Sequence, residues 1–260
     1  MATLIANGAG QPHDGASGTS SGPIGRAQRW TVGVVLASLA VFLVVMGSQF
    51  IMVSLAGLAG APVLAKLRQA IPVSANEAKD LLSAKQDEMK WLESGEAAID
   101  SGLAQLLIAE SLPADAKERD RFVAAAARDL KQGLAAAPLS GRGWARLAYS
   151  LAALEGWSPA AMSALRFSIV AAPFEPSLTL FRLRMGLEAW PQLDARDRAS
   201  VLQQVRYAAK VDLKALALLG EEQQSIPIVR AALRDEPHVL AELDRLRAQT
   251  GRDPQRRSGG

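Results

Sequence analysis

The chain has 260 residues, of which 49% are hydrophobic and 21% are charged, and this balance excludes a globally disordered protein. Cysteine is absent, which excludes disulfides, thiolate metal sites and cysteine nucleophiles. The formal net charge is +3, but the excess lies outside residues 69–250, which are slightly acidic. We therefore expect no nucleic-acid partner, and the only two histidines, His13 and His238, do not indicate a metal site.

The first 29 residues are predicted to form a disordered cytoplasmic tail. They have little apolar content, and glycine recurs among serines and threonines at Gly8, Gly10, Gly15, Gly18, Gly22 and Gly25. Residues 251–260 are basic and rich in glycine, and we expect a second disordered tail there.

An uncharged stretch follows the first tail and runs from Trp30 to Ala65. Its most apolar part, Val32 to Val53, would be about 33 Å long as a helix, and a bilayer's hydrocarbon core is roughly 30 Å thick. Residues 30–56 are therefore predicted to form a transmembrane helix in contact with the lipid bilayer. The alternative is a cleaved secretory signal, but the apolar part of such signals is usually only about 7–15 residues long.

The basic residues around this stretch predict the orientation. Arg26 and Arg29 lie directly before it, whereas Lys66 and Arg68 lie farther from its other end. The positive-inside rule then favours a single-pass inner-membrane protein with a cytoplasmic N-terminus. Arginine (21) far exceeds lysine (8), which favours a bacterial source and hence a periplasmic C-terminal domain.

Residues 57–75 are predicted to be a linker, and residues 76–250 an all-helical domain. Ala, Leu, Glu, Arg, Lys and Gln dominate the domain, and no alternating apolar pattern indicates strands. Capping residues and prolines divide it into helices. The predicted helices cover approximately residues 76–92, 94–111, 115–136, 140–156, 158–172, 175–190 and 194–220, followed by two shorter helices.

Part of the domain contains a repeated pattern. Ala136-Ala137-Pro138 recurs 35 residues later as Ala171-Ala172-Pro173. Between the two copies, large apolar residues alternate with small ones at helical spacing: Trp144, Leu147, Ala148 and Leu151, then Ala161, Leu165 and Ser168. The small residues let neighbouring helices approach closely while the large ones fill the gap between them. The next unit departs from the pattern, because Arg182 stands where a small residue is expected.

This pattern resembles the tetratricopeptide repeat. The resemblance covers about residues 116–220, with one good repeat and two degenerate ones. It implies an array of antiparallel helix pairs, which must stack because a single pair cannot bury its apolar face. The alternative is an ordinary helical bundle with coincidental periodicity.

In tetratricopeptide arrays the first helix of each pair lines a groove that binds partner peptides. The resemblance implies that several arginines and one tyrosine face this groove, where guanidinium groups would suit carboxylates, phosphates or acidic sugars. These candidate partner-binding residues are Arg142, Arg146, Tyr149, Arg182 and Arg184. The alternative is that the arginines are solvated and paired with nearby acids such as Glu155 and Glu188.

No pattern indicates catalysis or a cofactor. No pair of carboxylates stands out for acid–base chemistry, and the sequence has no phosphate-binding glycine loop. The predicted function is a membrane-anchored protein-interaction scaffold, by analogy in bacterial envelope or surface-polysaccharide assembly. The alternative is a non-catalytic binding module in which the arginines and Trp157 hold an anionic glycan.

Overall fold

The computed structural model describes residues 23–69 and 71–251. Residues 1–22 and 252–260, which make up most of the two predicted tails, lie outside the described residues. Residues 23–29 were expected to be disordered, but they form the first turns of a helix that continues into the apolar stretch.

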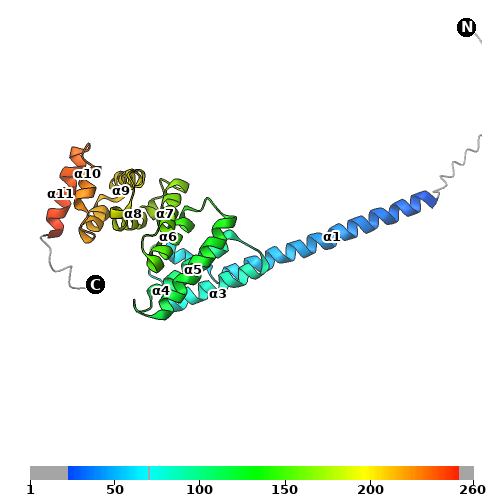
Figure 1. Cartoon of the computed structure of the whole chain (residues 1–260). Helices are drawn as coiled ribbons and strands as arrows, with labels where there is room; N and C mark the ends of the chain where they lie inside the picture. Colours follow the sequence, from blue (N-terminus) through cyan, green and yellow to red (C-terminus); the bar gives the residue numbers. More distant parts are fainter. Residues whose placement is uncertain (1–22, 70, 252–260) are drawn as a thin grey trace, which may run out of the picture. The chain divides into compact units, whose positions relative to one another are not determined.

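All regular structure in the described part of the chain is helical, which confirms the predicted all-α class (Figure 1). The helices are α1 (Pro23–Leu58), α2 (Ala61–Arg68), α3 (Ala75–Trp91), α4 (Gly95–Glu110), α5 (Lys117–Ala136), α6 (Gly141–Glu155), α7 (Pro159–Ala171), α8 (Pro176–Glu188), α9 (Ala195–Glu222), α10 (Ile226–Ala232) and α11 (Pro237–Gly251). A short 3₁₀ turn, Trp190–Gln192, lies between α8 and α9.

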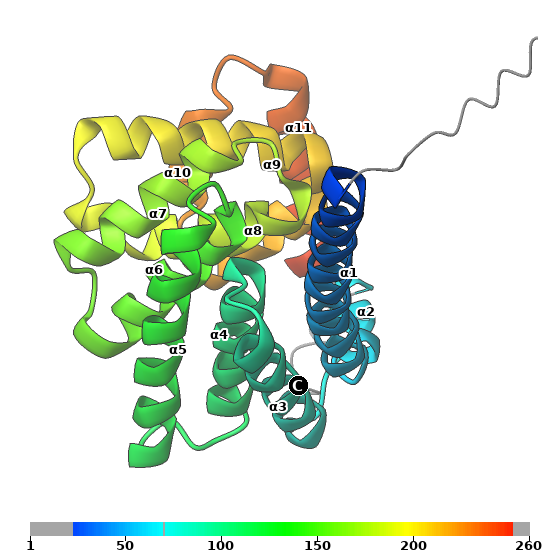
Figure 2. The same cartoon turned by 90° about the vertical axis from the view of Figure 1, so that its right-hand side faces the viewer.

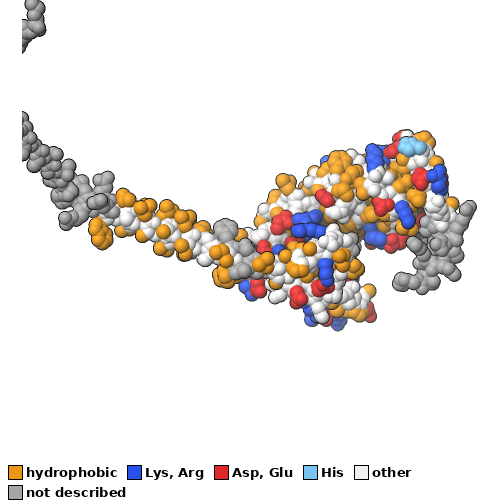
Figure 3. Space-filling model, turned by 180° about the vertical axis from the view of Figure 1, so that it is seen from behind, with side chains coloured by type: hydrophobic (Ala, Val, Ile, Leu, Met, Phe, Trp, Pro, Cys, Tyr) orange, Lys and Arg blue, Asp and Glu red, His pale blue; other side chains and the backbone are white. Residues whose placement is uncertain are grey.

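The chain divides into two compact units, residues 1–48 and 49–260, which are described separately. In the first unit, Trp30–Ser48 of α1 is long and apolar enough to cross a membrane, with a mean hydropathy of 2.3. As a helix its 19 residues span about 28 Å, close to the thickness of a hydrocarbon core. Hydrophobic side chains cover this stretch, whereas charges of both signs are scattered over the second unit (Figure 3).

Side-chain caps explain where five helices of the second unit begin. Each capping side chain accepts a backbone N–H from the third residue that follows, and the five are Ser74, Ser94, Ser140, Ser158 and Asp194. At α3 the cap is reciprocal, because the Glu77 carboxylate accepts from the backbone N–H of Ser74 at 2.9 Å. Helix α5, like α2, α8 and α10, begins without a side-chain cap; it starts at Lys117, after Ala116.

The segment predicted to be a linker, residues 57–75, contains helix α2. Val63 of α2 is buried against Leu81 of α3, and Lys66 forms an ion pair with Glu77. This turn of chain is amphipathic, so it folds onto α3 where a free linker was expected.

Consecutive helices from α2 to α9 are largely packed side by side (Figure 2). Helices α4 and α5 approach closely at Gly133, where a Cβ would lie only 2.7 Å from the carbonyl oxygen of Gly95. Alternate helices also touch, α4 with α6, α6 with α8, and α7 with α9. The small residues of the repeated pattern are fully buried at these contacts: Ala148, Ala161 and Ser168.

The domain has two main apolar cores. One is built from α4 to α8 and the other from α8 to α11. Trp157, in the turn between α6 and α7, packs against both. Helix α9, predicted as one continuous helix, is kinked at Asp212, whose carboxylate accepts the N–H of Ala215 at 2.9 Å and so caps the second half.

Candidate functional site

Two of the predicted site residues, Arg142 and Arg146, lie on the side of α6 that faces α4. Arg142 donates to the Glu96 carboxylate at 3.1 Å, and both side chains are about half exposed. Arg146 lies deeper, 3.6 Å from the Asp100 carboxylate, and also donates to the carbonyl oxygen of Ile99 at 3.5 Å. Burial lowers the pKa of Arg146, although Asp100 opposes that effect. Both guanidinium groups are therefore held by α4.

Tyr149 lies on the same side of α6, about one helical turn beyond Arg146. Its ring lies 5.8 Å from the ring of Phe181 on α8, and the side chain is half-buried. Burial raises the pKa of Tyr149 and also that of Glu110, which Arg119 and Tyr149 partly offset. The hydroxyl thus belongs to a small polar cluster between α4, α5 and α6.

Arg182, predicted to face a binding groove, points into the interior, and only 1% of its surface is exposed. Its guanidinium donates to the hydroxyl of Ser168 at 2.8 Å, to the carbonyl oxygen of Ser168 at 2.7 Å and to that of Ala172 at 2.6 Å. The Ser168 hydroxyl donates in turn to the carbonyl oxygen of Gly141 at 2.7 Å. Burial lowers the pKa of Arg182 to about 10. Arg182 therefore joins the end of α7 to α8 and is not accessible to a partner.

Arg184 is exposed but occupied. It makes two hydrogen bonds to the Glu222 carboxylate, at 2.6 and 2.8 Å, and this pairing raises its pKa and lowers that of Glu222. Arg142, Arg146 and Arg184 are thus paired with acids, as the alternative interpretation expected, but with Glu96, Asp100 and Glu222 of other helices. We call the surface formed by Arg142, Arg146 and Tyr149 with their α4 and α8 neighbours the paired face.

The opposite side of α6 lines a hollow of about 470 Å³, which we call the apolar groove. It lies between α5, α6 and α7. Its floor consists of buried apolar side chains, Leu134, Leu147, Leu151 and Ala164, and its rims of more exposed residues, Lys131, Ala135, Trp144, Ala160, Ser163 and Phe167. A pre-formed apolar recess with few polar groups is typical of a binding site for a hydrophobic side chain or helix.

Two stacked aromatic residues, Trp144 and Phe167, form part of the groove's rim. The rings of Trp144 and Phe167 are stacked, with centroids 4.9 Å apart and planes inclined by 29°. The indole nitrogen of Trp144 donates to the carbonyl oxygen of Pro138 at 2.8 Å, which fixes the ring's orientation. Trp144 was expected to fill the gap between helices, but it is only partly buried. Phe167 is 51% exposed, although burying a phenylalanine side chain would be favourable by roughly 1.5–3 kcal/mol.

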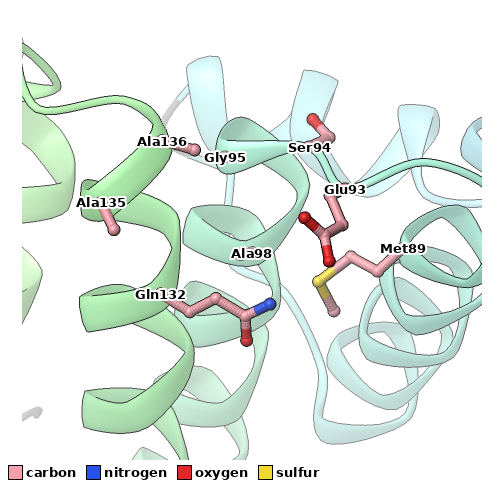
Figure 4. Close-up of a pocket in the computed structure, with 8 residues that line it drawn as sticks. All are labelled: Met89, Glu93, Ser94, Gly95, Ala98, Gln132, Ala135 and Ala136. Atoms are coloured by element: carbon pink, nitrogen blue, oxygen red, sulfur yellow. The ribbon is translucent and has the colours of Figure 1, made fainter.

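A second hollow, of about 440 Å³, lies on the other side of α5 (Figure 4). Met89 and Glu93 approach it from the α3 side, and Gln132 points into it from α5. Ala135 lines both hollows, so the last turns of α5 form the ridge between them. Among the described residues no group of three or more metal-ligating side chains occurs.

The apolar groove was not predicted from the sequence, but a signal for it exists. Helix α7 contains a single charged residue, Arg166, whose guanidinium is bound by Asp197 of α9 at 2.6 and 2.7 Å. A helix that is apolar nearly all round is normally buried, yet α7 lies at the surface with Phe167 and Val170 exposed. Such a helix indicates an unfilled apolar surface.

Comparisons of the chain with protein-family models, with curated proteins and with solved structures found no match.

Proposed function

We propose that this protein is a membrane-anchored adaptor that binds another protein through its helical domain and does not catalyse a reaction. The observation that carries the proposal is the apolar groove, an open recess with an apolar floor and stacked aromatic rings of Trp144 and Phe167 on its rim. Exposed apolar surface of this kind is usually covered by a partner in the functional state.

The domain architecture that we propose is a tetratricopeptide-like array of antiparallel helix pairs. The contacts of α4 with α6 and of α6 with α8 support it, because first helices of successive pairs touch in such an array. The buried small residues Ala148, Ala161 and Ser168 support it as well. In this register the apolar groove would lie between the second helices α5 and α7, with α6 contributing part of its floor, on the side of α6 opposite to the predicted arginine groove.

Helix α1 gives the adaptor its proposed location. We infer that Trp30–Ser48 crosses the inner membrane with the N-terminus in the cytoplasm, so that the helical domain works in the periplasm on envelope assembly. An anchor of this kind raises the effective concentration of the domain for any partner in the same membrane. A glycan-binding role gains less support, because carboxylates of the chain already occupy Arg142, Arg146 and Arg184.

Site-specific photocrosslinking in intact cells tests this proposal. A benzophenone amino acid at Phe167 is expected to form a discrete protein adduct, and the same group at Leu218, which is similarly exposed on α9, is expected to form none. The change Ala160→Arg should fill the groove and abolish the adduct. Equal adducts at both positions, or none at Phe167, would contradict the proposal.

The proposed orientation has its own test. A tag fused after Gly260 is expected to become sensitive to protease once the outer envelope is opened. Protection until the inner membrane is lysed would place the domain, and its partners, in the cytoplasm.

A further inference from the structure

We propose that the occupant of the apolar groove is an amphipathic helix of a partner protein that carries acidic residues along one flank. This inference rests on the proposed adaptor function and adds the chemistry of the partner. It follows from the shape of the groove and from the distribution of charge around it.

The shape of the groove favours a helix that inserts side chains. The apolar floor is recessed, because Leu134, Leu147 and Leu151 are each at most 6% exposed while the rim residues rise above them. A flat lipid surface cannot reach such a floor, whereas apolar residues at helical spacing can enter it from above. Helix-in-groove recognition works in this way.

The α5 rim of the groove carries basic side chains that are not paired with carboxylates of the described residues. Lys131 lines the groove and Arg128 precedes it by one turn on the same side of α5, and both are exposed. No carboxylate of the described residues lies within 4 Å of either cation. The nearest acid along the helix, Asp129, is turned away toward α4, where it accepts hydrogen bonds from Ser101, at 2.7 Å, and from Gln105.

The basic line continues toward the beginning of α5. Lys117 and Arg121 are also exposed and, within the described chain, also lack a carboxylate within 4 Å. Their spacing from Arg128 and Lys131 places all four cations on one side of the helix, over a length of about 21 Å. A partner helix of about four turns would match that length.

The α7 rim carries no free charge. Its single cation, Arg166, is bound by Asp197, and the other residues of this rim are the exposed Ala160 and Phe167 and the partly buried Ser163. The groove is therefore asymmetric, basic along α5 and apolar along α7. A helix with an apolar seam and acids on the α5 flank is complementary to both rims, and such complementarity sets partner choice and orientation.

Two synthetic peptides test the charge preference. Both are fluorescent 18-residue helices with the same apolar seam, and one has glutamates on its flank where the other has lysines. Binding is measured by fluorescence anisotropy with the full-length chain in detergent micelles at low salt. The glutamate peptide is expected to bind about tenfold more tightly.

Three variants locate the effect. Arg128→Glu with Lys131→Glu is expected to reverse the preference, so that the lysine peptide binds more tightly. Lys210→Glu with Lys214→Glu is the matched control, because these exposed lysines lie on α9, and it should leave both affinities unchanged. Ala160→Arg should abolish binding of both peptides by filling the groove.

A lipid occupant is examined directly. Because the chain has no cysteine, Phe167→Cys gives a single site for an environment-sensitive fluorophore. We expect its emission to respond to the glutamate peptide and to be the same in nanodiscs of phosphatidylcholine and of phosphatidylglycerol. A response to the anionic lipid alone would overturn the inference in favour of the bilayer surface.

The inference is also overturned if wild-type protein does not distinguish the two peptides, or if reversal at Arg128 and Lys131 leaves the preference unchanged. A protein adduct at Phe167 in cells together with either result would leave the adaptor function standing and remove only the acidic helix. Absence of any protein adduct would instead contradict the adaptor function itself.

Discussion

Helix α6 separates two surfaces that differ in whether their charged and apolar side chains already have partners within the domain. On the paired face, Arg142 and Arg146 reach carboxylates of α4, and Tyr149 packs against α8. On the other side, the apolar groove exposes Phe167, and the cations of its α5 rim have no acid within 4 Å in the described part of the chain.

The difference separates the charged groups that stabilise the domain from the groups that remain available to the proposed partner. Charges that neighbouring helices already neutralise hold the domain together, and a partner would have to break those pairs to use them. Apolar rims and unpaired cations contribute little to folding and remain available to a partner. The candidate arginines that stood out in the sequence therefore serve mainly to stabilise the domain.

The largest expected effect is that of Arg182, the interior arginine next to the paired face. Arg182→Ala leaves the carbonyl oxygens of Ser168 and Ala172 without their donor and opens a cavity. We expect the free energy of unfolding to fall by about 3 kcal/mol. Chemical denaturation followed by circular dichroism measures this loss.

The neighbouring exposed arginine is the control for that experiment. Arg184→Ala removes only a surface pair with Glu222 and should lower the free energy of unfolding by less than about 1 kcal/mol. Similar losses for both variants would mean that the hydrogen bonds of Arg182 add nothing to stability.

A smaller difference is expected between the two arginines of the paired face itself. Arg146→Ala leaves Asp100, whose side chain is only 14% exposed, without its cation, and should lower the free energy of unfolding by about 1–2 kcal/mol. Arg142→Ala should lower it by roughly 0.5 kcal/mol or less, because both members of its pair are half exposed. Only the loss at Arg142 should vanish in high salt. Equal losses at both sites would show that the burial of an ion pair on the paired face does not change its contribution to the free energy of unfolding.

Much of the fold could be predicted from local chemistry. A serine or aspartate at a helix start accepts the backbone N–H of the residue three positions later, so this signal involves only a few neighbouring residues. Ser94, Ser140 and Asp194 therefore lie at observed helix starts. The kink at Asp212 could not be predicted in this way, because an aspartate within a helical pattern is equally compatible with an exposed position in an unbroken helix.

The site could not be predicted as well, because side-chain direction depends on tertiary neighbours. The sequence did contain a warning at Arg182, which occupies a position where the repeat places a small, buried residue. A long side chain there had to enter the interior. The exposure of Phe167 depends on which helices cover α7. The nearly uncharged sequence of α7 indicates an apolar surface there but does not say whether another helix of the domain covers it.

The groove should respond to substitution in the opposite way to the paired face. Phe167→Ser removes a half-exposed ring and should change the free energy of unfolding by less than about 1 kcal/mol. Binding of the glutamate peptide should nevertheless weaken about tenfold, because the aromatic rim is lost. Leu218→Ser, at a similarly exposed position on α9, should affect neither quantity. A large loss of stability at Phe167 would make it a core residue and the groove a packing defect.

The smallest effect is a pH dependence that comes from the exposed pair of Arg184 with Glu222. Arg184 lowers the pKa of Glu222 below its ordinary value of 4.5. The unfolded chain then binds this proton more readily than the folded one, so the contribution of the pair is present above about pH 4.5 and is lost as the pH falls through the lowered pKa.

Glu222→Gln isolates that contribution. The free energies of unfolding of the wild type and the variant should differ by a constant amount above about pH 4.5 and should converge below it. Glu155→Gln is the matched control, since Glu155 is exposed and has no cation within 4 Å among the described residues, and its difference should not vary in this way. At each pH the glutamate peptide should bind the wild type and Glu222→Gln equally well, because Glu222 does not line the apolar groove. A groove affinity that fell together with the Arg184–Glu222 pair would show that the two surfaces are coupled, and the separation of stability from binding along α6 would no longer hold.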